Sequence, residues 1–203
     1  MREHRAGWLG IAFVVLLLLQ AGMADIPTLE TPIGRIQRFY ANHGGIIVAA
    51  QVISIFASVL FLLFAWALAG QLDPRTAPVM TRLRATGVLV GLASIATAIP
   101  PVLLALASSP SDATAHALTR AADLTDVVLF SAIALFSLEV ARDATIGWLK
   151  GAALAVVALS VVRAVLGVAE VTALDIVAPL AFLALVVAVS IGVLRGRLDS
   201  AAA

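Results

Sequence analysis

The chain contains no cysteine. Without thiols it cannot form disulfides, use a thiolate nucleophile, hold an iron–sulfur cluster or build a zinc site that needs cysteine. Charge is also scarce, because Asp, Glu, Lys and Arg make up 12% of the 203 residues, about half the share in soluble domains. The net charge of +1 provides no broad basic surface, so we expect no nucleic-acid partner.

Apolar residues take the place of the missing charges. They make up 62% of the chain and give a mean hydropathy of +1.09. A water-soluble core of this size cannot hide so much apolar surface. The hydrocarbon layer of a bilayer, roughly 30 Å thick, accepts about 20 apolar residues per helix. We therefore predict an all-α fold, a polytopic membrane helix bundle in which residues 1–203 form a single transmembrane domain.

Apolar runs separated by short polar segments predict six transmembrane helices. They cover approximately residues 6–23, 46–68, 86–107, 124–140, 148–168 and 174–194. The first run has an alternative interpretation as a cleaved signal peptide, since Gly22-Met23-Ala24 is a passable cleavage site. Its length favours a retained helix, because the apolar part of a signal peptide usually has about 7–15 residues.

Two polar segments carry helix-start signals. Thr31-Pro32 precedes Ile33, Ile36, Phe39 and Tyr40 at helical spacing, which predicts a short amphipathic surface helix over residues 32–42. Gly44-Gly45 is expected to end it or to act as a hinge. Ser109-Pro110-Ser111-Asp112 is expected to start a helix that runs through polar residues into the fourth span. Pro100-Pro101 is expected to interrupt the third.

The basic residues predict the orientation. With the N-terminus inside, the inner segments hold nine of them, namely Arg2, Arg5, Arg75, Arg82, Arg84, Arg142, Lys150, Arg195 and Arg197. The outer segments hold Arg35, Arg38 and Arg120. Cytoplasmic loops carry an excess of Lys and Arg, so we expect both termini in the cytoplasm.

Arg163 is the clearest ionisable residue within a predicted span. A charge at that depth is costly unless it is paired or functional. The turn before the fifth span centres on residues 144–145, so antiparallel register places Asp126 at the depth of Arg163. We therefore predict a buried Asp126–Arg163 salt bridge in the outer half of the bilayer. Glu139 and Lys150 share the same register near the cytoplasmic surface, but both pairs cannot face one seam, and Lys150 can reach water without a partner.

Further polar features lie at the outer level of the bundle. The candidate intramembrane polar site, an outward-facing cavity, consists of Gln51, Pro100, Pro101, Asp126, Arg163 and Asp175. The alternative is structural, with one ion pair and a kinked helix that lock the bundle. His4, His43 and His116 lack metal-ligand spacing. We therefore expect no catalytic, cofactor-binding or metal-binding residues.

A resemblance rests on two short motifs. The segment Arg38-Phe39-Tyr40-Ala41-Asn42-His43 leads into an apolar helix that ends Phe64-Ala65-Trp66-Ala67-Leu68. This pattern resembles a group of uncharacterised multi-pass membrane proteins of actinobacteria. The resemblance covers about the first third of the chain and implies a bacterial plasma-membrane protein without indicating an activity.

The sequence favours a non-enzymatic accessory or scaffolding component of a membrane assembly, with no cofactor and with the lipid bilayer as its surroundings. A membrane-protein partner or a second copy of the chain is the expected neighbour. The alternative is a small transporter, channel, or lipid or small-molecule binder that uses the cavity around Asp126 and Arg163. The small-residue motif Gly87-x-x-x-Gly91 is expected to pack inside the bundle rather than to form a dimer face.

Overall fold

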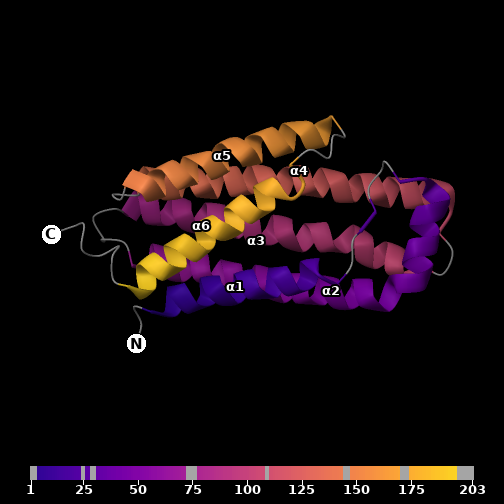
Figure 1. Ribbon diagram of the computed structural model, residues 1–203, viewed down its shortest axis with the longest axis horizontal. Helices are drawn as coiled ribbons and strands as arrows, with labels where there is room; N and C mark the ends of the chain where they lie inside the picture. The colour runs from indigo at the N-terminus through magenta and orange to yellow at the C-terminus, as the bar shows by residue number, and fades with distance from the viewer. Residues whose placement is uncertain are drawn as a thin grey trace.

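The computed structural model describes residues 4–23, 26–27, 31–71, 77–107, 110–143, 147–169 and 174–195. Within these ranges the chain forms α-helices joined by short connections (Figure 1), so the predicted all-α class is confirmed. The helices are α1 Arg5–Ala21, α2 Ile33–Ala69, α3 Ala77–Leu106, α4 Asp112–Asp143, α5 Gly147–Val168 and α6 Val177–Leu194.

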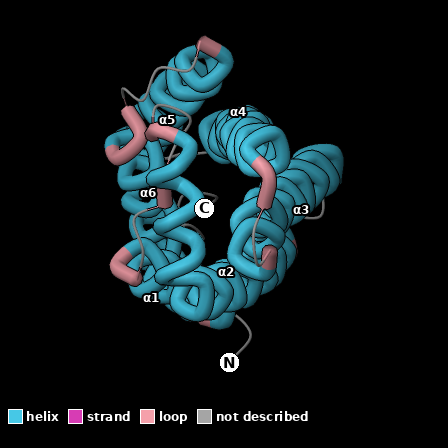
Figure 2. The backbone as a smooth tube through the Cα atoms, turned by 90° about the vertical axis from the view of Figure 1, so that its right-hand side faces the viewer, coloured by secondary structure: helices cyan, strands magenta, loops and turns pink. Residues whose placement is uncertain are grey.

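The helices form a closed ring. Each packs against the next along the chain, and α6 completes the ring by packing against α1. Figure 2, a view towards one end of the bundle, shows this circular order. The start of α1 and the end of α6 lie at the same end of the bundle (Figure 1). A ring with this order has a shared interior to which every helix can contribute side chains.

The helices fall into two length classes. α2, α3 and α4 have 37, 30 and 32 residues, and they extend past the other helices at one end of the bundle (Figure 1). α2 to α6 are five helices long and apolar enough to cross a membrane. α1 is apolar but has 17 residues, about 25 Å of helix. A multi-pass membrane bundle is therefore supported, whereas a sixth span stays a prediction.

The predicted surface helix and second span are one continuous helix, α2. Its backbone stays helical through Gly44 and Gly45, so the expected helix end there is wrong. The alternative expectation, a hinge, is compatible with the change of direction between the two parts of α2 (Figure 1). A Cβ added at Gly44 would lie 3.0 Å from the carbonyl oxygen of Ala105 in α3. Gly44 therefore serves close helix packing here rather than helix termination, as small residues do at membrane helix contacts.

The N-terminal part of α2 lies across the end of the bundle (Figure 1). Ile36 and Tyr40 are buried against Leu104 of α3 and Ala115 of α4. Gln37 donates hydrogen bonds of 2.9 Å from Nε2 to the carbonyl of Pro110 and to Oδ1 of Asp112. These contacts, which come from distant parts of the sequence, extend the helix beyond its apolar run.

The third helix begins earlier than its predicted span, whereas the fourth begins at Asp112, where the polar start signal predicted it. α3 starts at Ala77, and it continues through Pro100-Pro101, so the expected interruption is wrong. Two prolines remove two backbone hydrogen bonds, but α3 packs between α2 and α4, and this contact holds the helix together. α4 starts at Asp112, where the backbone N–H of Thr114 donates to Oγ of Ser111 at 3.2 Å. This is the N-cap geometry that the polar start signal predicted.

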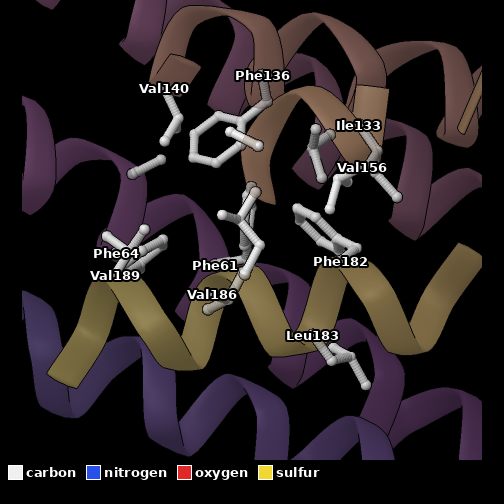
Figure 3. Close-up of a cluster of buried hydrophobic side chains, with 14 of the residues drawn as sticks. Phe61, Phe64, Ile133, Phe136, Val140, Val156, Phe182, Leu183, Val186 and Val189 are labelled. Carbon is white, nitrogen blue, oxygen red and sulfur yellow. The ribbon is translucent and has the colours of Figure 1, made fainter. Parts of the chain in front are cut away.

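A cluster of phenylalanines fills one part of the ring. Phe61 of α2 lies at its centre, with ring centroids 5.0 Å from Phe13, 5.8 Å from Phe64, 5.2 Å from Phe136 and 5.7 Å from Phe182. Figure 3 shows Phe61, Phe136 and Phe182 converging from α2, α4 and α6. Aromatic pairs at these separations add stability beyond the area they bury. We call these five residues the phenylalanine cluster.

The small-residue motif in α3 packs inside the bundle. A Cβ added at Gly87 would collide with Cβ of Ala65, and one at Gly91 would lie 2.5 Å from Leu62. Both neighbours are in α2, so the expectation of internal packing is confirmed.

Candidate functional site: a cavity inside the helix ring

A cavity of about 380 Å³ lies inside the ring, and residues from every helix line it. Ligand pockets have volumes of roughly 300–1,000 Å³, so this one suits a small molecule. The lining is Phe13, Leu17, Gln20, Ala21, Ile26, Ser58, Phe61, Val90, Gly91, Ser94, Asp123, Asp126, Leu129, Phe130, Ile133, Arg163, Asp175, Pro179, Phe182 and Leu183.

The apolar end of the cavity is the phenylalanine cluster. Phe13, Phe61 and Phe182 belong both to the cavity lining and to the cluster. The remaining rings, Phe64 and Phe136, lie farther along α2 and α4, towards the end where α1 begins. The cluster therefore forms a floor that separates the cavity from that end of the bundle.

The polar end of the cavity carries four ionisable side chains. Asp123 and Asp126 lie one turn apart on α4, Arg163 is on α5, and Asp175 directly precedes α6. Nε of Arg163 is 2.8 Å from Oδ1 of Asp175. The N–H does not point at that oxygen, so the contact is an ion pair and not an aligned hydrogen bond. Nη2 of Arg163 is 3.9 Å from Oδ2 of Asp126.

Burial differs between the partners of these ion pairs. The side chain of Arg163 is 11% exposed, whereas those of Asp126 and Asp175 are 41% and 32% exposed. The guanidinium also lies over the ring of Phe130, 5.4 Å from its centroid, within the range of a cation–π contact. The predicted Asp126–Arg163 pair is present, but only its basic member is buried, because the carboxylate borders the cavity.

The carboxylate nearest to Arg163 is that of Asp175. The sequence predicted Asp175 in the cavity but did not predict its pairing with Arg163. The chain turns through Leu174, whose φ of 76° lies in the left-handed region that leucine rarely adopts. This turn directly precedes Asp175 and positions it against α5. Backbone geometry of this kind cannot be read from helix register, so register alone identified only the Asp126 contact.

Three of the predicted site residues lie outside the cavity lining. Gln51, Pro100 and Pro101 are all buried, but none of them borders the cavity. On α3 the lining ends at Ser94, and Pro100 lies six residues farther along, about 9 Å of helix. The cavity therefore extends less far towards the ends of α2 and α3 than the sequence indicated.

Sequence reasoning missed several lining residues. Ser58 and Ser94 face each other across α2 and α3, with 2.8 Å between their Oγ atoms. Asp123 is one of the polar residues that lead into the fourth predicted span, and the predicted site did not include it. The sequence marks both serines as polar residues within apolar runs. That they lie together could be seen only from the packing of α2 on α3.

A second ionic cluster lies near the opposite end of the bundle and does not border the cavity. Glu139 of α4 is buried and accepts hydrogen bonds from Nε of Arg82 on α3, at 3.0 Å, and from Arg142. Lys150 is exposed. Glu139 therefore pairs across α3 and α4, and the alternative register pair with Lys150 is not what the structure shows.

The carboxylates of the cavity do not converge as metal ligands. Among the described residues, no group of three or more His, Asp or Glu side chains is arranged to hold a metal ion. Instead, the cavity has an ionic mouth, formed by the four ionisable side chains of its polar end, and an aromatic floor, formed by the phenylalanine cluster.

Comparisons with known proteins give no match to a family model, a curated protein or a solved structure. The resemblance to actinobacterial membrane proteins therefore stays a prediction, and the functional argument rests on the geometry of the cavity.

Proposed function

We propose that this protein is a six-span protein of the bacterial plasma membrane that binds a small amphipathic molecule in the cavity beside Asp126 and Arg163. The observation that carries the proposal is the cavity itself, of about 380 Å³ and lined by every helix of the ring. Its aromatic floor suits an apolar body and its ionic mouth suits a polar group. Binding sites for small molecules combine these two features.

A bundle that serves only as a scaffold has no need of such a space. Protein interiors are packed to a density of about 0.75, and unfilled space costs stability. Ionisable residues at membrane depth are also costly and mark functional sites by default. The accessory role that the sequence favoured explains neither feature, so ligand binding becomes the first candidate.

Exposed tryptophans support the placement in the bilayer. Trp8, Trp66 and Trp148 are all exposed, and they lie at the start of α1, the end of α2 and the start of α5. These three positions share one end of the bundle, as the alternating helix directions require. Tryptophan is enriched at membrane interfaces, and basic residues are enriched on the cytoplasmic side. Arg82 and Lys150 lie near the same end, so the cavity faces outward in this proposal.

Native mass spectrometry of the protein extracted gently from its own membrane tests the function. We expect a monomer or homo-oligomer that carries a discrete small mass. Ser94→Phe, which places a ring in the cavity, should remove this mass. Ser131→Phe is the matched control, because Ser131 is exposed on the outer face of α4. Retention of the mass in Ser94→Phe, or a stoichiometric protein partner without a small molecule, would favour the accessory role instead.

A further inference from the structure

We propose that the molecule bound in the cavity carries a positive charge on an apolar body, as an alkylammonium group does. This inference rests on the proposed function. Its starting point is the charge balance of the described cavity lining, which has three carboxylates, Asp123, Asp126 and Asp175, and one guanidinium, Arg163. The formal net charge of these lining residues is −2.

The guanidinium is already engaged by the protein. Arg163 is buried and lies 2.8 Å from Asp175 and 3.9 Å from Asp126. An anionic ligand would have to displace these contacts and then face the remaining carboxylates at close range. Like charges in a partly dehydrated site repel strongly, because the effective dielectric constant there is far below that of water. The cavity therefore selects against anions.

The α4 wall offers the position for a cation. Asp123 and Asp126 are three residues apart on one helix, so their side chains share a face. The carboxylate of Asp126 is 41% exposed where it borders the cavity, so part of its surface is accessible to a bound group. A cation at this wall would reduce the repulsion between the two carboxylates.

The aromatic lining favours the same ligand. Phe13, Phe61, Phe130 and Phe182 all contribute to the cavity surface. Ring faces attract organic cations, particularly quaternary ammonium groups, when water is excluded. The ring face of Phe130 already lies against the guanidinium of Arg163, so this part of the lining accommodates positive charge beside an aromatic ring. An apolar body would lie on the floor and its charged group would lie at the mouth.

Size-matched probes test the charge preference directly. Benzyltrimethylammonium and neopentylbenzene have the same shape, with a quaternary nitrogen replaced by carbon. Calorimetric titration of the intact protein in a neutral detergent at low ionic strength should show binding of the cation at least about tenfold tighter than binding of the neutral probe. Equal or tighter binding of the neutral probe would overturn the charge preference and leave the proposed function standing. Absence of binding by both probes would overturn both.

Single neutral substitutions locate the site. Asp123→Asn and Asp126→Asn should each lower the affinity for the cation by about tenfold and leave the affinity for the neutral probe unchanged. Asp112→Asn is the control on the same helix, because its side chain lies outside the cavity and still offers an oxygen to Gln37. Unchanged cation affinity in both cavity variants would contradict the assignment. A variant that binds neither probe has lost its fold. The charge preference is then decided by the relative affinities of the two probes for the wild-type protein.

The ammonium group can belong to a free amine or to a lipid headgroup. Addition of phosphatidylethanolamine to the detergent solution separates these sources. Competition between this lipid and benzyltrimethylammonium supports a headgroup ligand, whereas cation binding that the lipid does not affect supports a free amine.

Discussion

Nε of Arg163, in α5, lies 2.8 Å from Oδ1 of Asp175, at the start of α6. The contact joins the end of one helix to the start of the next across the polar end of the cavity. The side chain of Arg163 is nearly buried, with 11% of its surface exposed, whereas the side chain of Asp175 is 32% exposed. The ion pair thus combines a buried base with an accessible acid, and its contribution to stability lies between that of a surface pair and that of a buried pair.

The first prediction compares the two acids that contact Arg163. Asp175→Asn should reduce the free energy of unfolding by about 1–2 kcal/mol, because a nearly buried guanidinium loses its closest counter-charge. Asp126→Asn should cost less, since its oxygen lies 3.9 Å away and is more exposed. Denaturant titration in mixed micelles measures both values. A larger loss for Asp126→Asn would show that the register pair dominates.

The second prediction concerns Glu139, which links α3 to α4. Glu139→Gln should lower stability by about 1–3 kcal/mol, because the buried side chain loses the charge that pairs with Arg82 and Arg142. Lys150→Gln is the control and should change stability little, since Lys150 is exposed. Thermal unfolding of both variants in one detergent provides the comparison. Equal losses would revive the Glu139–Lys150 pairing.

The third prediction tests the close contact of α2 and α3. Gly87→Leu should destabilise the protein by about 1–3 kcal/mol, because its side chain would meet Ala65. Gly151→Leu is the matched control, as a Cβ added there meets nothing within 4 Å. Unfolding and size-exclusion chromatography should be measured together. Dissociation of an oligomer by Gly87→Leu, without loss of fold, would assign the motif to a subunit interface.

The fourth prediction concerns the floor of the cavity. Phe61→Ala should cost about 3–5 kcal/mol, because a fully enclosed ring is removed from the centre of the phenylalanine cluster. Phe61→Leu should cost less, since more of the volume is retained. Phe56→Ala is the control on the same helix, because Phe56 is exposed on its outer face. Similar losses at Phe56 and Phe61 in unfolding experiments would argue against a packed floor.

Residue spacing predicted the contact between Asp126 and Arg163 because α4 and α5 are antiparallel neighbours that follow each other closely in the sequence. In such a pair, depth along one helix determines depth along the other, and 1.5 Å per residue is a dependable measure. The same reasoning could not rank Asp175 above Asp126. That distance depends on the backbone at Leu174, with its φ of 76°, which no apolar periodicity encodes.

Helix ends were predicted less well than helix centres. Apolar runs marked the central part of each helix, but α2, α3 and α4 continue beyond those runs. Their extensions are stabilised by contacts such as Ile36 with Leu104, between residues far apart in the sequence. Gly44-Gly45 was therefore interpreted as a helix end or a hinge and Pro100-Pro101 as an interruption, although the backbone stays helical through both segments where they pack on neighbouring helices.

By itself, the sequence determined the helical class of the protein and the matching level of Asp126 and Arg163 along α4 and α5, because hydropathy and helical rise are local quantities. Only the tertiary structure decided that the helices close into a ring, with a floor of phenylalanines and with Asp123, Ser58 and Ser94 in the cavity lining. It also excluded Gln51 and the two prolines from that lining. The physical reason is that a cavity is defined by how helices rotate and pack around a common interior. That rotation follows from many side-chain contacts between helices acting together.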